Sequence, residues 1–497
     1  MADPQSLYSE YSEEKVRIDK LEKIKKRGIN PYPNPAKRTY TCAKAIQGFE
    51  KLTKKQTIIR LMGRIRSIRL HGGSCFAHIE DETEKMQIYL RRNILGKKSY
   101  NFFKDLIDVG DIIEVRGTFF STKKGEKTLL VQSFKLLTKS LLPLPEKWHG
   151  LTQIEVRYRK RYLDLIANPQ VKFIFQKRSL VIKAIREFFD RLGFIEVETP
   201  VLQPIPGGAA ACPFKTYHNA LDQYLYLRIA PELYLKRLMI GGFEKIYEIS
   251  RCFRNEGIDH LHNPEFTQIE FYQAYTDYKD AMKITEKLLS AIIEKVNKKL
   301  IIEYEGHKIN FKHPFPRLTF REALIKYAGI DIEKYGENKD LVQKIKEFKK
   351  EELKEEFHHG KSIEELYKIF VRPKIIQPTF IINHPIEISP LAKRIIGTQY
   401  VERFQLLVAG GIELVNAFSE LNDPLDQEER FHLQERLRKI GDKEAQRFDK
   451  DFIEALKYGM PPTAGFGMGI DRLVMLLTNS HNIKEVILFP ALRSKTN

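Results

Sequence analysis

Residues 464–475 read AGFGMGIDRLVM and join a strand-like run of alternating glycines to the start of a helix. Gly465, Gly467 and Gly469 lead directly into Arg472 and an apolar helical pattern. Glycine lets the backbone lie close under a flat or charged ligand, and the permanently ionised arginine can pair with phosphate or stack on a purine. Alternating glycines alone more often reflect close packing, so this stretch predicts a nucleotide site only together with others.

Two further stretches support it. Residues 252–257 read CFRNEG and are followed by HNPEFTQIE at 262–270, which sets Arg254 beside a dense acidic and polar run. Residues 193–200 read GFIEVETP, a glycine followed by an alternating strand that ends at a proline. Two arginines, one on each side of the acidic and polar run, indicate phosphate chemistry, and the three stretches together are far stronger evidence than any one of them.

In this order and spacing the three stretches resemble motifs 1, 2 and 3 of class II aminoacyl-tRNA synthetases. PGGA at 206–209, APELYLKR at 230–237 and NAFSELNDP at 416–424 narrow the resemblance to the lysyl-tRNA synthetase family. It covers about residues 10–492. The implied fold is α+β: an N-terminal five-stranded OB-fold β-barrel, then a class II catalytic domain with an antiparallel β-sheet flanked by helices.

Composition agrees with this. The chain has 497 residues, enough for two or three domains with their own cores. Lysine and arginine number 84 against 65 aspartates and glutamates, so the formal net charge is +19. Such a surplus favours a polyanionic partner, although charge alone fits a lysine-rich proteome equally well.

The cysteines and the hydropathy of the chain indicate the cellular compartment in which the protein is expected. Cys42, Cys75, Cys212 and Cys252 are widely scattered, with no spacing typical of a zinc site. We expect reduced, mostly buried thiols in a cytoplasmic protein. No apolar run approaches the roughly 20 residues that a bilayer span needs, so neither export nor membrane anchoring is predicted.

Sequence patterns divide the chain. Residues 1–55 are predicted as an N-terminal helical extension with a charged helix over 13–26. Residues 56–142 carry five short alternating runs with a helix-like interruption near 98–107, which suits an OB-type barrel.

The remainder is assigned to a linker and the catalytic domain. Residues 143–170 are predicted as a linker, whose basic and aromatic run at 157–164 could bind RNA, face an acidic partner or lie between domains. The catalytic domain is predicted over 171–497, with an exposed insertion at about 331–368. It begins with a helix over 175–192 that Gly193 caps, then a strand over 194–199. The resemblance places the homodimer interface on that helix and strand.

In the resembled family the barrel reads the tRNA anticodon. Phe76, Gln87 and Glu126 match the base-stacking aromatic and two hydrogen-bonding residues, which implies tRNA(Lys) as a partner. A lone phenylalanine would more often belong to the core.

The reaction that the resemblance implies is ATP-dependent ligation of lysine to tRNA. Attack of a carboxylate on the α-phosphate of ATP needs positioning and charge neutralisation but no enzyme nucleophile. Arg254 and Arg472 match the catalytic arginines, at the α-phosphate and the γ-phosphate. The remaining residues of the implied ATP site are Glu256, His262, Asn263, Phe266, Glu413 and Gly469.

The substrate L-lysine carries two ammonium groups, and each needs a charged acceptor once it leaves water. Gly208 and Glu232 match the family's α-amino site, while Tyr272 and Glu420 match its ε-ammonium site. The resemblance completes the lysine pocket with Arg254, Glu270, Asn416 and Phe418.

One departure concerns magnesium. The family usually reads Arg-Phe-Glu where this chain has Arg403-Phe404-Gln405, and the following turn is one residue longer. Glu413 remains as a Mg²⁺ ligand, whereas the amide of Gln405 neutralises no charge. Glu402 is expected to point to the opposite face of the strand. We therefore expect weaker metal binding.

Three alternatives stay open. Aspartate and asparagine ligases share this architecture, but their substrates need a positive pocket, against which Glu270, Tyr272 and Glu420 argue. Gln405 motivates a paralogue that binds RNA without charging it. An enzyme that transfers lysine to a protein would leave Phe76, Gln87 and Glu126 unexplained.

Overall fold

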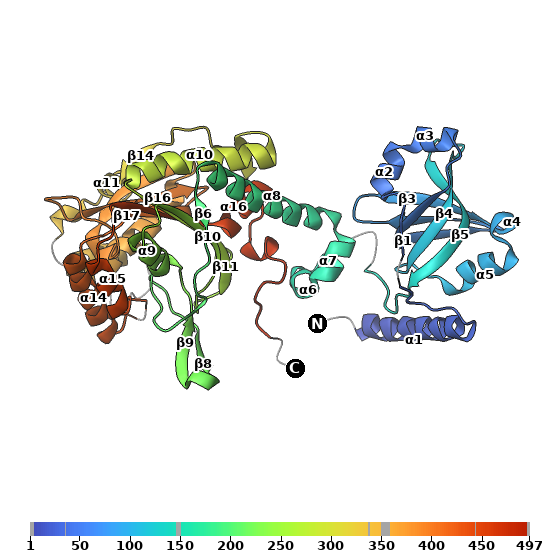
Figure 1. Ribbon diagram of the computed structural model, residues 1–497, viewed down its shortest axis with the longest axis horizontal. Coiled ribbons are helices and arrows are strands. Elements are labelled where there is room, and N and C mark those ends of the chain that lie inside the picture. The colour runs from blue at the N-terminus through green and yellow to red at the C-terminus, as the bar shows by residue number, and fades with distance from the viewer. Residues whose placement is uncertain are drawn as a thin grey trace. The chain divides into compact units, whose positions relative to one another are not determined.

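The structure is a computed structural model that describes residues 4–34, 36–145, 151–335, 338–348, 358–442 and 444–494 (Figure 1). The chain divides into two compact units, Met1–Thr152 and Gln153–Asn497. This boundary falls inside the segment 143–170 that the sequence predicts as a linker. No helix in the described ranges is long and apolar enough to cross a bilayer.

The first unit is built around a closed five-stranded barrel, as predicted. Its elements are α1 (Pro4–Lys26), α2 (Cys42–Gln47), α3 (Phe49–Lys54), β1 (Ile59–His71), β2 (Ser74–Glu80), β3 (Lys85–Arg91), α4 (Arg92–Leu95), α5 (Lys97–Leu106), β4 (Ile112–Ser121) and β5 (Lys127–Thr138). The strand order is β1-β2-β3-β5-β4. Cys75, Ala77 and Ile79 of β2 are buried while their neighbours are not, which is the two-residue period of a half-buried strand.

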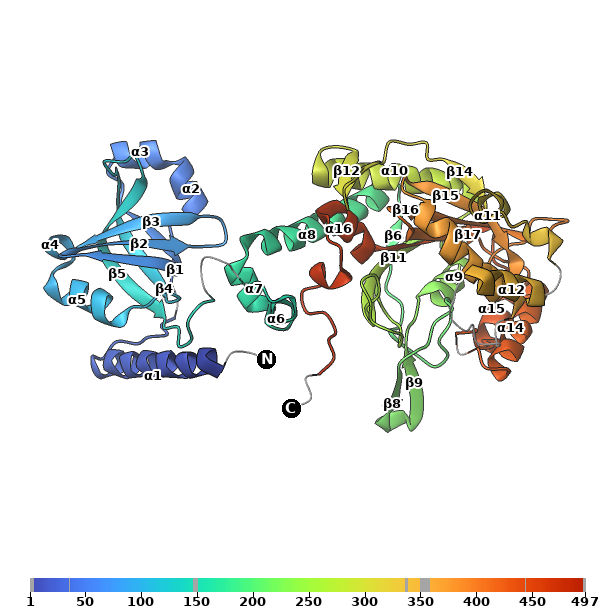
Figure 2. The same ribbon diagram turned by 180° about the vertical axis from the view of Figure 1, so that it is seen from behind.

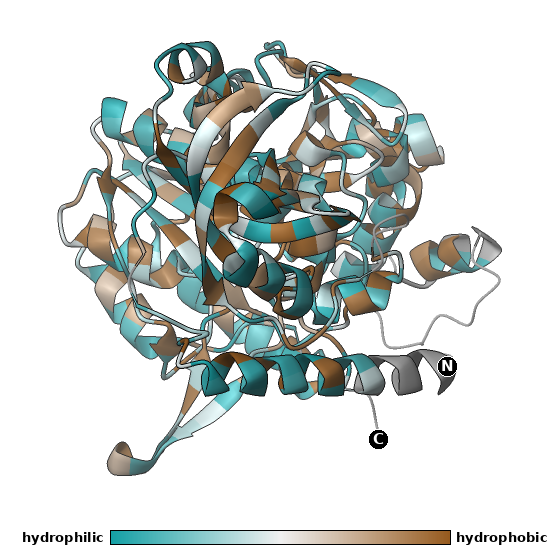
Figure 3. Cartoon of the chain, turned by 90° about the vertical axis from the view of Figure 1, so that its right-hand side faces the viewer, coloured by the Kyte–Doolittle hydropathy of each residue, from teal (hydrophilic) through white to brown (hydrophobic). Residues whose placement is uncertain are grey.

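The residues before the barrel form part of its core. The first helix begins at Pro4, earlier than the predicted start at residue 13. Ile24 of α1, together with Phe49 and Leu52 of α3, is buried in the same apolar cluster as the barrel residues. Figure 3 shows apolar residues interspersed among polar ones along α1. Part of the predicted extension 1–55, from Ile24 to Leu52, therefore contributes to the core of the barrel unit.

The second unit combines a large sheet with helices, in agreement with the predicted catalytic fold. Its α-helices are α6 (Ile154–Arg159), α7 (Arg161–Ala167), α8 (Pro169–Arg191), α9 (Glu232–Ile240), α10 (Tyr278–Asn297), α11 (Phe320–Ala328), α12 (Asn338–Phe348), α13 (His359–Leu366), α14 (Pro424–Lys439), α15 (Lys450–Lys457) and α16 (Ile470–Thr478). Its strands are β6 (Ile195–Glu196), β7 (Leu202–Gln203), β8 (Lys215–His218), β9 (Gln223–Leu227), β10 (Lys245–Phe253), β11 (Glu265–Ala274), β12 (Ile301–Tyr304), β13 (His307–Asn310), β14 (Arg317–Thr319), β15 (Thr379–Pro385), β16 (Tyr400–Val408), β17 (Ile412–Ser419) and β18 (Thr463–Gly469). Shorter helical turns are η1 (Asn219–Leu221), η2 (Ile332–Lys334), the π-helical η3 (Tyr367–Val371), η4 (Arg372–Lys374), η5 (Ile386–Ile388) and η6 (Ile483–Glu485).

Eight strands form the main sheet, in the order β14-β15-β16-β17-β18-β11-β10-β6. Pairing is antiparallel throughout the middle and parallel only at the two outer pairs. One face is buried under α8, α10 and α16, which Figures 1 and 2 show along the same side of the sheet. Phe271 and Phe466 stack on that face with ring centroids 4.6 Å apart. Since side chains alternate along a strand, Gly465 and Gly467 lie on the opposite face.

The helix predicted over 175–192 begins earlier, at Pro169, and ends as expected. Gly193 follows it with φ +75°, a left-handed conformation that favours glycine. The predicted strand over 194–199 is shorter, because only β6 pairs regularly with β10. Beyond it, the Thr199 hydroxyl donates to Glu248 at 2.7 Å instead of continuing the ladder.

The basic run at 157–164 has structural roles within the second unit. Arg161 is buried and donates to the carbonyl oxygens of Leu488 and Ile487 at 3.0 and 3.1 Å. It also pairs with the buried Asp164 at 2.7 Å, and Arg157 contacts the same carboxylate at 2.8 Å. These contacts tie the first helices of the unit to its C-terminal segment.

The predicted insertion at about 331–368 contains η2, α12 and α13, while its residues 336–337 and 349–357 lie outside the described ranges. Ile345 and Leu366 are buried in one cluster with Phe320 and Leu407. The insertion therefore packs on the sheet edge near β15 and β16 and is not exposed throughout.

Asp471, in the first turn of α16, joins three elements, and its removal is expected to destabilise the second unit. Its carboxylate accepts hydrogen bonds from the Thr267 backbone amide at 2.7 Å and from Arg178 of α8 at 2.5 Å. Asp471→Ala removes the carboxylate partner of the partly buried Arg178 guanidinium and leaves the buried Thr267 amide unpaired. We expect a loss of about 3 kcal/mol in the free energy of unfolding, measured by urea denaturation with far-UV circular dichroism.

The matched control is Asp280→Ala, which breaks an exposed pair with Lys283 and should cost less than about 1 kcal/mol. Equal losses in the two variants would contradict the structural role of Asp471.

Candidate active site

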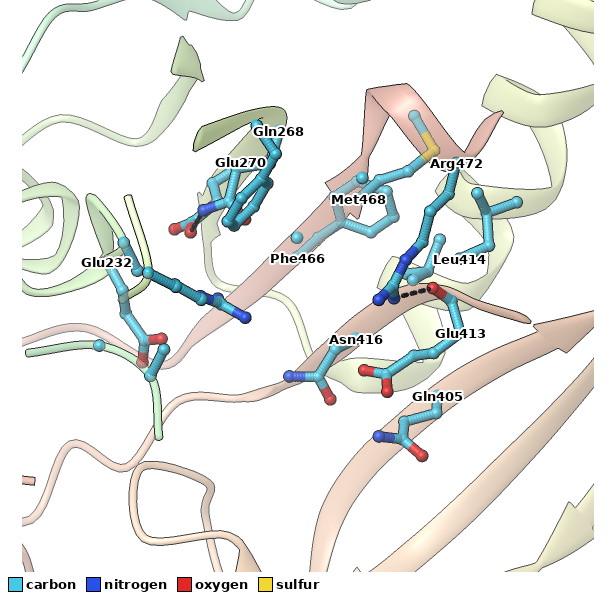
Figure 4. Close-up of a pocket in the computed structure, with 18 of the residues that line it drawn as sticks. Glu232, Gln268, Glu270, Gln405, Glu413, Leu414, Asn416, Phe466, Met468 and Arg472 are labelled. Atoms are coloured by element: carbon cyan, nitrogen blue, oxygen red, sulfur yellow. Dashed lines mark hydrogen bonds between the residues drawn. The ribbon is translucent and has the colours of Figure 1, made fainter. Parts of the chain in front are cut away.

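A cavity of about 350 Å³ opens on the glycine-bearing face of the central strands. It brings together every site residue that the sequence predicts for the catalytic domain. These lining residues are Gly208, Glu232, Arg254, Glu256, His262, Asn263, Phe266, Glu270, Tyr272, Gln405, Glu413, Asn416, Phe418, Glu420, Gly469 and Arg472. Figure 4 shows Glu232 and Glu270 toward one end of the cavity and Arg472 with Glu413 toward the other.

Strand register makes the alternating glycines the floor of this cavity. Gly467 lies between Glu270 and Asn416, and Gly465 lies between Tyr272 and Phe418 on the flanking strands. A Cβ atom on Gly465 would stand 1.8 Å from Glu420 Oε1 and 2.7 Å from a ring carbon of Tyr272. The close approach predicted from the sequence is therefore required here, because a larger residue would collide with the site.

The acidic end contains three buried glutamates and one buried lysine, which contacts two of them. Lys236 Nζ lies 2.7 Å from Glu232 Oε1 and also contacts Glu420 Oε2. Gln268 donates to Glu270 at 2.7 Å, and the Tyr272 hydroxyl donates to it at 3.1 Å. Glu420 Oε1 has no hydrogen-bond donor among the described residues. Such an oxygen is costly to bury unless a ligand supplies the donor.

Burial changes the protonation of this end. It raises the pKa of Glu270 well above its usual value, and the neighbouring Glu232 raises that pKa further. Burial also raises the pKa of Glu420 well above the ordinary range, which Lys236 only partly offsets. For Lys236, burial lowers the pKa but the carboxylates of Glu232 and Glu420 outweigh it, so the ammonium stays charged. A cationic ligand beside these carboxyl groups would lower their pKa values again.

The opposite end carries arginines. The guanidinium of Arg254 lies over the Phe266 ring, 5.0 Å from its centroid. Arg472 donates to the Glu413 carbonyl oxygen at 2.8 Å and to His262 Nε2 at 3.1 Å. Although burial raises the pKa of Glu413, several surrounding arginines hold that pKa below its usual value, so its carboxylate stays ionised.

The pair formed by Gln405 and Glu413 does not fit a cation held by two carboxylates, because the side chain at 405 is a neutral amide. The Oε1 atom of Gln405 accepts a hydrogen bond from the Tyr367 hydroxyl at 2.9 Å and lies 3.3 Å from His384 Nε2. Arg372 approaches Glu413 Oε2 to 3.7 Å. Among the described residues, no group of three or more His, Cys, Asp and Glu side chains is placed to hold a metal ion.

The sequence missed several lining residues. Lys236 stands four residues after Glu232 on α9, a spacing that could have revealed the pair. Arg403 donates a hydrogen bond to Asn416 at 2.9 Å. It belongs to the segment Arg403-Phe404-Gln405, which the sequence singled out only for metal binding. Glu364 lines the cavity from the predicted insertion, and no local pattern marks it because only the tertiary fold brings α13 to β16.

The three predicted anticodon residues lie in the barrel of the first unit. Phe76 of β2 pairs across the strands with Tyr89 of β3, and their rings stack with centroids 4.3 Å apart. Gln87 donates to Thr128 at 2.8 Å. Glu126 lies 3.5 Å from His78, the residue that pairs with Gln87. Phe76, Gln87 and Glu126 therefore belong to adjoining strands and the turn before β5.

Comparison with known proteins agrees with both units. Residues 153–493 match the family of class II tRNA synthetases (D, K and N), and residues 59–137 match the OB-fold nucleic acid binding domain. The chain belongs to the class II tRNA synthetases of this group, which confirms the predicted resemblance. Similar proteins include the lysine–tRNA ligase of Carboxydothermus hydrogenoformans, 51% identical over 97% of this chain and 98% of the relative. The lysine–tRNA ligase of Campylobacter jejuni strain RM1221 is 49% identical over 97% of each chain, and that of Roseiflexus castenholzii is 49% identical over 96% of this chain and 98% of the relative.

The raised pKa of Glu270 predicts a specific dependence of stability on pH. The folded chain holds a proton that the unfolded chain has released above about pH 4.5, so this group's stabilising contribution is lost as the pH rises. Glu270→Gln removes that loss. Between pH 5 and 8 we expect the unmodified chain to lose more stability than this variant, on the order of 2 kcal/mol in urea denaturation.

Glu303→Gln, on an exposed position of β12, is the control and should follow the unmodified chain. Parallel stability curves for Glu270→Gln and the unmodified chain would show that Glu270 is ionised in the folded protein.

Proposed function

We propose that this chain is a lysine–tRNA ligase, which activates lysine with ATP to lysyl-adenylate and transfers lysine to the 3′ end of tRNA(Lys). The observation that carries this is Glu420 Oε1, a buried carboxylate oxygen that has no donor among the described residues and points at the glycine floor. A cationic hydrogen-bond donor on the substrate would satisfy this oxygen, and the acidic end of the cavity is suited to such a group.

Charge balance at the acidic end favours a substrate with two ammonium groups. Glu232, Glu270 and Glu420 outnumber Lys236 by two charges when all are ionised. Glu232 beside Gly208 would accept the α-ammonium group of lysine, and Glu420 with Tyr272 the ε-ammonium group. Glu270, Asn416 and Phe418 would complete the wall. A neutral side chain would leave Glu420 unpaired, and a shorter cation would stop short of it.

The arginine end would take the nucleotide. Arg254 would bind the α-phosphate and the lysine carboxylate, and Arg472 the γ-phosphate. Their charges would offset the negative charge that spreads over the phosphoryl group as the reaction proceeds. The adenine would lie against the Phe266 ring, and the remaining members of the ATP site would be Glu256, His262, Asn263, Glu413 and Gly469.

Both chemical steps then follow from positioning. A lysine carboxylate oxygen attacks the α-phosphorus in line, the bond from that phosphorus to the bridging oxygen breaks, and pyrophosphate leaves. The terminal ribose hydroxyl of tRNA then attacks the lysyl carbonyl, loses its proton, and AMP departs. No side chain of the enzyme forms a covalent intermediate. Magnesium is proposed as the counter-ion that ATP brings, with Glu413 as the carboxylate that would hold it.

The barrel would read the anticodon. Phe76 would stack on a base, and Gln87 and Glu126 would donate and accept hydrogen bonds on its edge, a combination that suits single-stranded nucleic acid. The net charge of +19 favours a polyanion of this size. Division of the chain into anticodon-binding residues 56–142, a linker 143–170 and a catalytic domain 171–497 belongs to the same proposal.

A cytoplasmic homodimer completes the proposal. Exposed apolar side chains gather on α8 and the segment after it, and such patches mark association surfaces. They are Phe173, Leu180, Ile195, Val201 and Leu202. Burial raises the pKa of Cys42 and of Cys252 to about 12, which keeps both thiols protonated and unreactive, as suits a reducing compartment.

The first experiment is amino-acid-dependent exchange of pyrophosphate into ATP. We expect exchange with lysine alone among the twenty amino acids, because only lysine places a cation at Glu420. Glu420→Gln should lower kcat/KM for lysine by about a hundredfold or more, since it removes the charged acceptor of a buried ammonium. The control Glu429→Gln changes an exposed glutamate of α14 and should leave the rate unchanged.

Absence of exchange with every amino acid would overturn the ligase proposal and favour an RNA-binding paralogue. Exchange that Glu420→Gln leaves unchanged would place the lysine ammonium elsewhere.

The barrel assignment is tested by Phe76→Leu. Loss of one base–aromatic stack should raise KM for tRNA in the charging reaction by about tenfold. Pyrophosphate exchange does not involve tRNA, so it should be unaffected and serves as the control in the same preparation. Unchanged charging kinetics would assign Phe76 to packing with Tyr89 alone.

A further inference from the structure

The helix that follows the insertion changes its geometry beside the cavity. After α13 the chain continues as the π-helical turn η3, Tyr367–Val371, and then as η4. π-Helical turns are rare and occur frequently at functional sites. This turn presents Tyr367 to Gln405 and sets Arg372 at the turn between β16 and β17.

Arg372 is held firmly at this turn. Its Nε and one terminal nitrogen donate to the Gly411 carbonyl oxygen at 3.1 and 2.9 Å. Gly411 has φ +107°, and a Cβ atom there would stand 2.8 Å from the carbonyl carbon of Arg372. The long turn that the sequence singled out thus needs glycine to admit this arginine.

The other terminal nitrogen of Arg372 faces the cavity's carboxylate. It lies 3.7 Å from Glu413 Oε2, too far for a hydrogen bond. Among the described residues this nitrogen makes no hydrogen bond beyond its ion pair with Glu413. Arg372 lines a hollow that shares Glu364, Arg403 and Gln405 with the main cavity. One face of the guanidinium is therefore fixed, and the remaining donor is available to a ligand.

Positive charge at this end exceeds negative charge. Four arginines act together on the carboxylate of Glu413, namely Arg254, Arg372, Arg403 and Arg472. Glu364 is a second carboxylate lining this cavity, and the further carboxylates Glu256 and Asp259 are exposed to solvent, so the charge set back from solvent is predominantly positive. Gln405 adds none, since its amide is neutral and its oxygen already accepts from Tyr367. A fixed surplus of this kind suits a polyanion.

We propose that Arg372 is a further contact for the phosphates of the nucleotide. Its guanidinium would neutralise phosphate charge at the position where two carboxylates would otherwise hold a metal ion. Gln405 and Arg372 then act as a pair. A neutral amide at 405 does not attract a metal ion, which the positive charge of Arg372 would repel. This inference rests on the proposed function and names a substrate-binding residue within it.

Equilibrium binding of ATP and of AMP to the full chain, measured by titration calorimetry, separates the phosphate contact from general damage. Arg372→Gln should weaken ATP binding by about ten- to a hundredfold, the effect of losing one charge-assisted hydrogen bond, and leave AMP within about twofold. The control Lys374→Gln removes the same charge from an exposed residue of η4 and should change neither affinity. Thermal unfolding midpoints report whether each variant is folded.

A second variant tests the pair without removing Arg372. Gln405→Glu supplies the missing carboxylate, so ATP binding should become more dependent on free Mg²⁺ than in the unmodified chain. Equal losses of ATP and AMP affinity in Arg372→Gln, or no loss of either, would overturn the inference, as would an unchanged Mg²⁺ dependence in Gln405→Glu. Lysine-dependent pyrophosphate exchange by the unmodified chain is scored separately, so the ligase proposal can stand when this one fails.

Discussion

The burial of three glutamate carboxylates in one cavity, with a single lysine ammonium between two of them, is the constraint on which the site of the second unit depends. Carboxylates are costly to remove from water unless cations or donors meet them. The structure meets this cost by placing Lys236 on α9 between Glu232 and Glu420, by donating to Glu270 from two neighbours, and by raising the pKa values of Glu270 and Glu420. What remains unmatched is one oxygen of Glu420, and that mismatch defines the pocket.

The sheet serves this arrangement through its two faces. On one face, large apolar side chains pack under α8, α10 and α16, which fixes the register of the strands. On the other, Gly465 and Gly467 leave room for Tyr272, Glu420 and a ligand. Asp471 links the two, because it joins the start of α16 to β11 and α8. Packing on the far side thereby sets the distances at the cavity.

The two ends of the cavity are complementary in charge to the two ends of the proposed reactants. Carboxylates gather where the ammonium groups of lysine would lie, and arginines gather where phosphates would lie. Between them only the lysine carboxylate and the α-phosphate need to meet, so the reaction would be governed by position more than by any reactive side chain. Arg372 extends the positive end from an element outside the strands that form the rest of the site.

The sequence by itself determined the class of fold, the five-strand barrel, and the membership of the cavity. The fold and the barrel depend on local patterns of alternation and glycine phase, whereas most of the site residues came from the resemblance to a known family, and Arg403 and Glu364 of the cavity were not foreseen. It also marked Gln405 and the long turn as departures. Only the tertiary structure decided that β6 is two residues long and that Glu364, Tyr367 and Arg372 lie at the site. The physical reason is that these outcomes depend on contacts between segments distant in the chain, such as the π-helical turn against β16 and β17, which no local periodicity records.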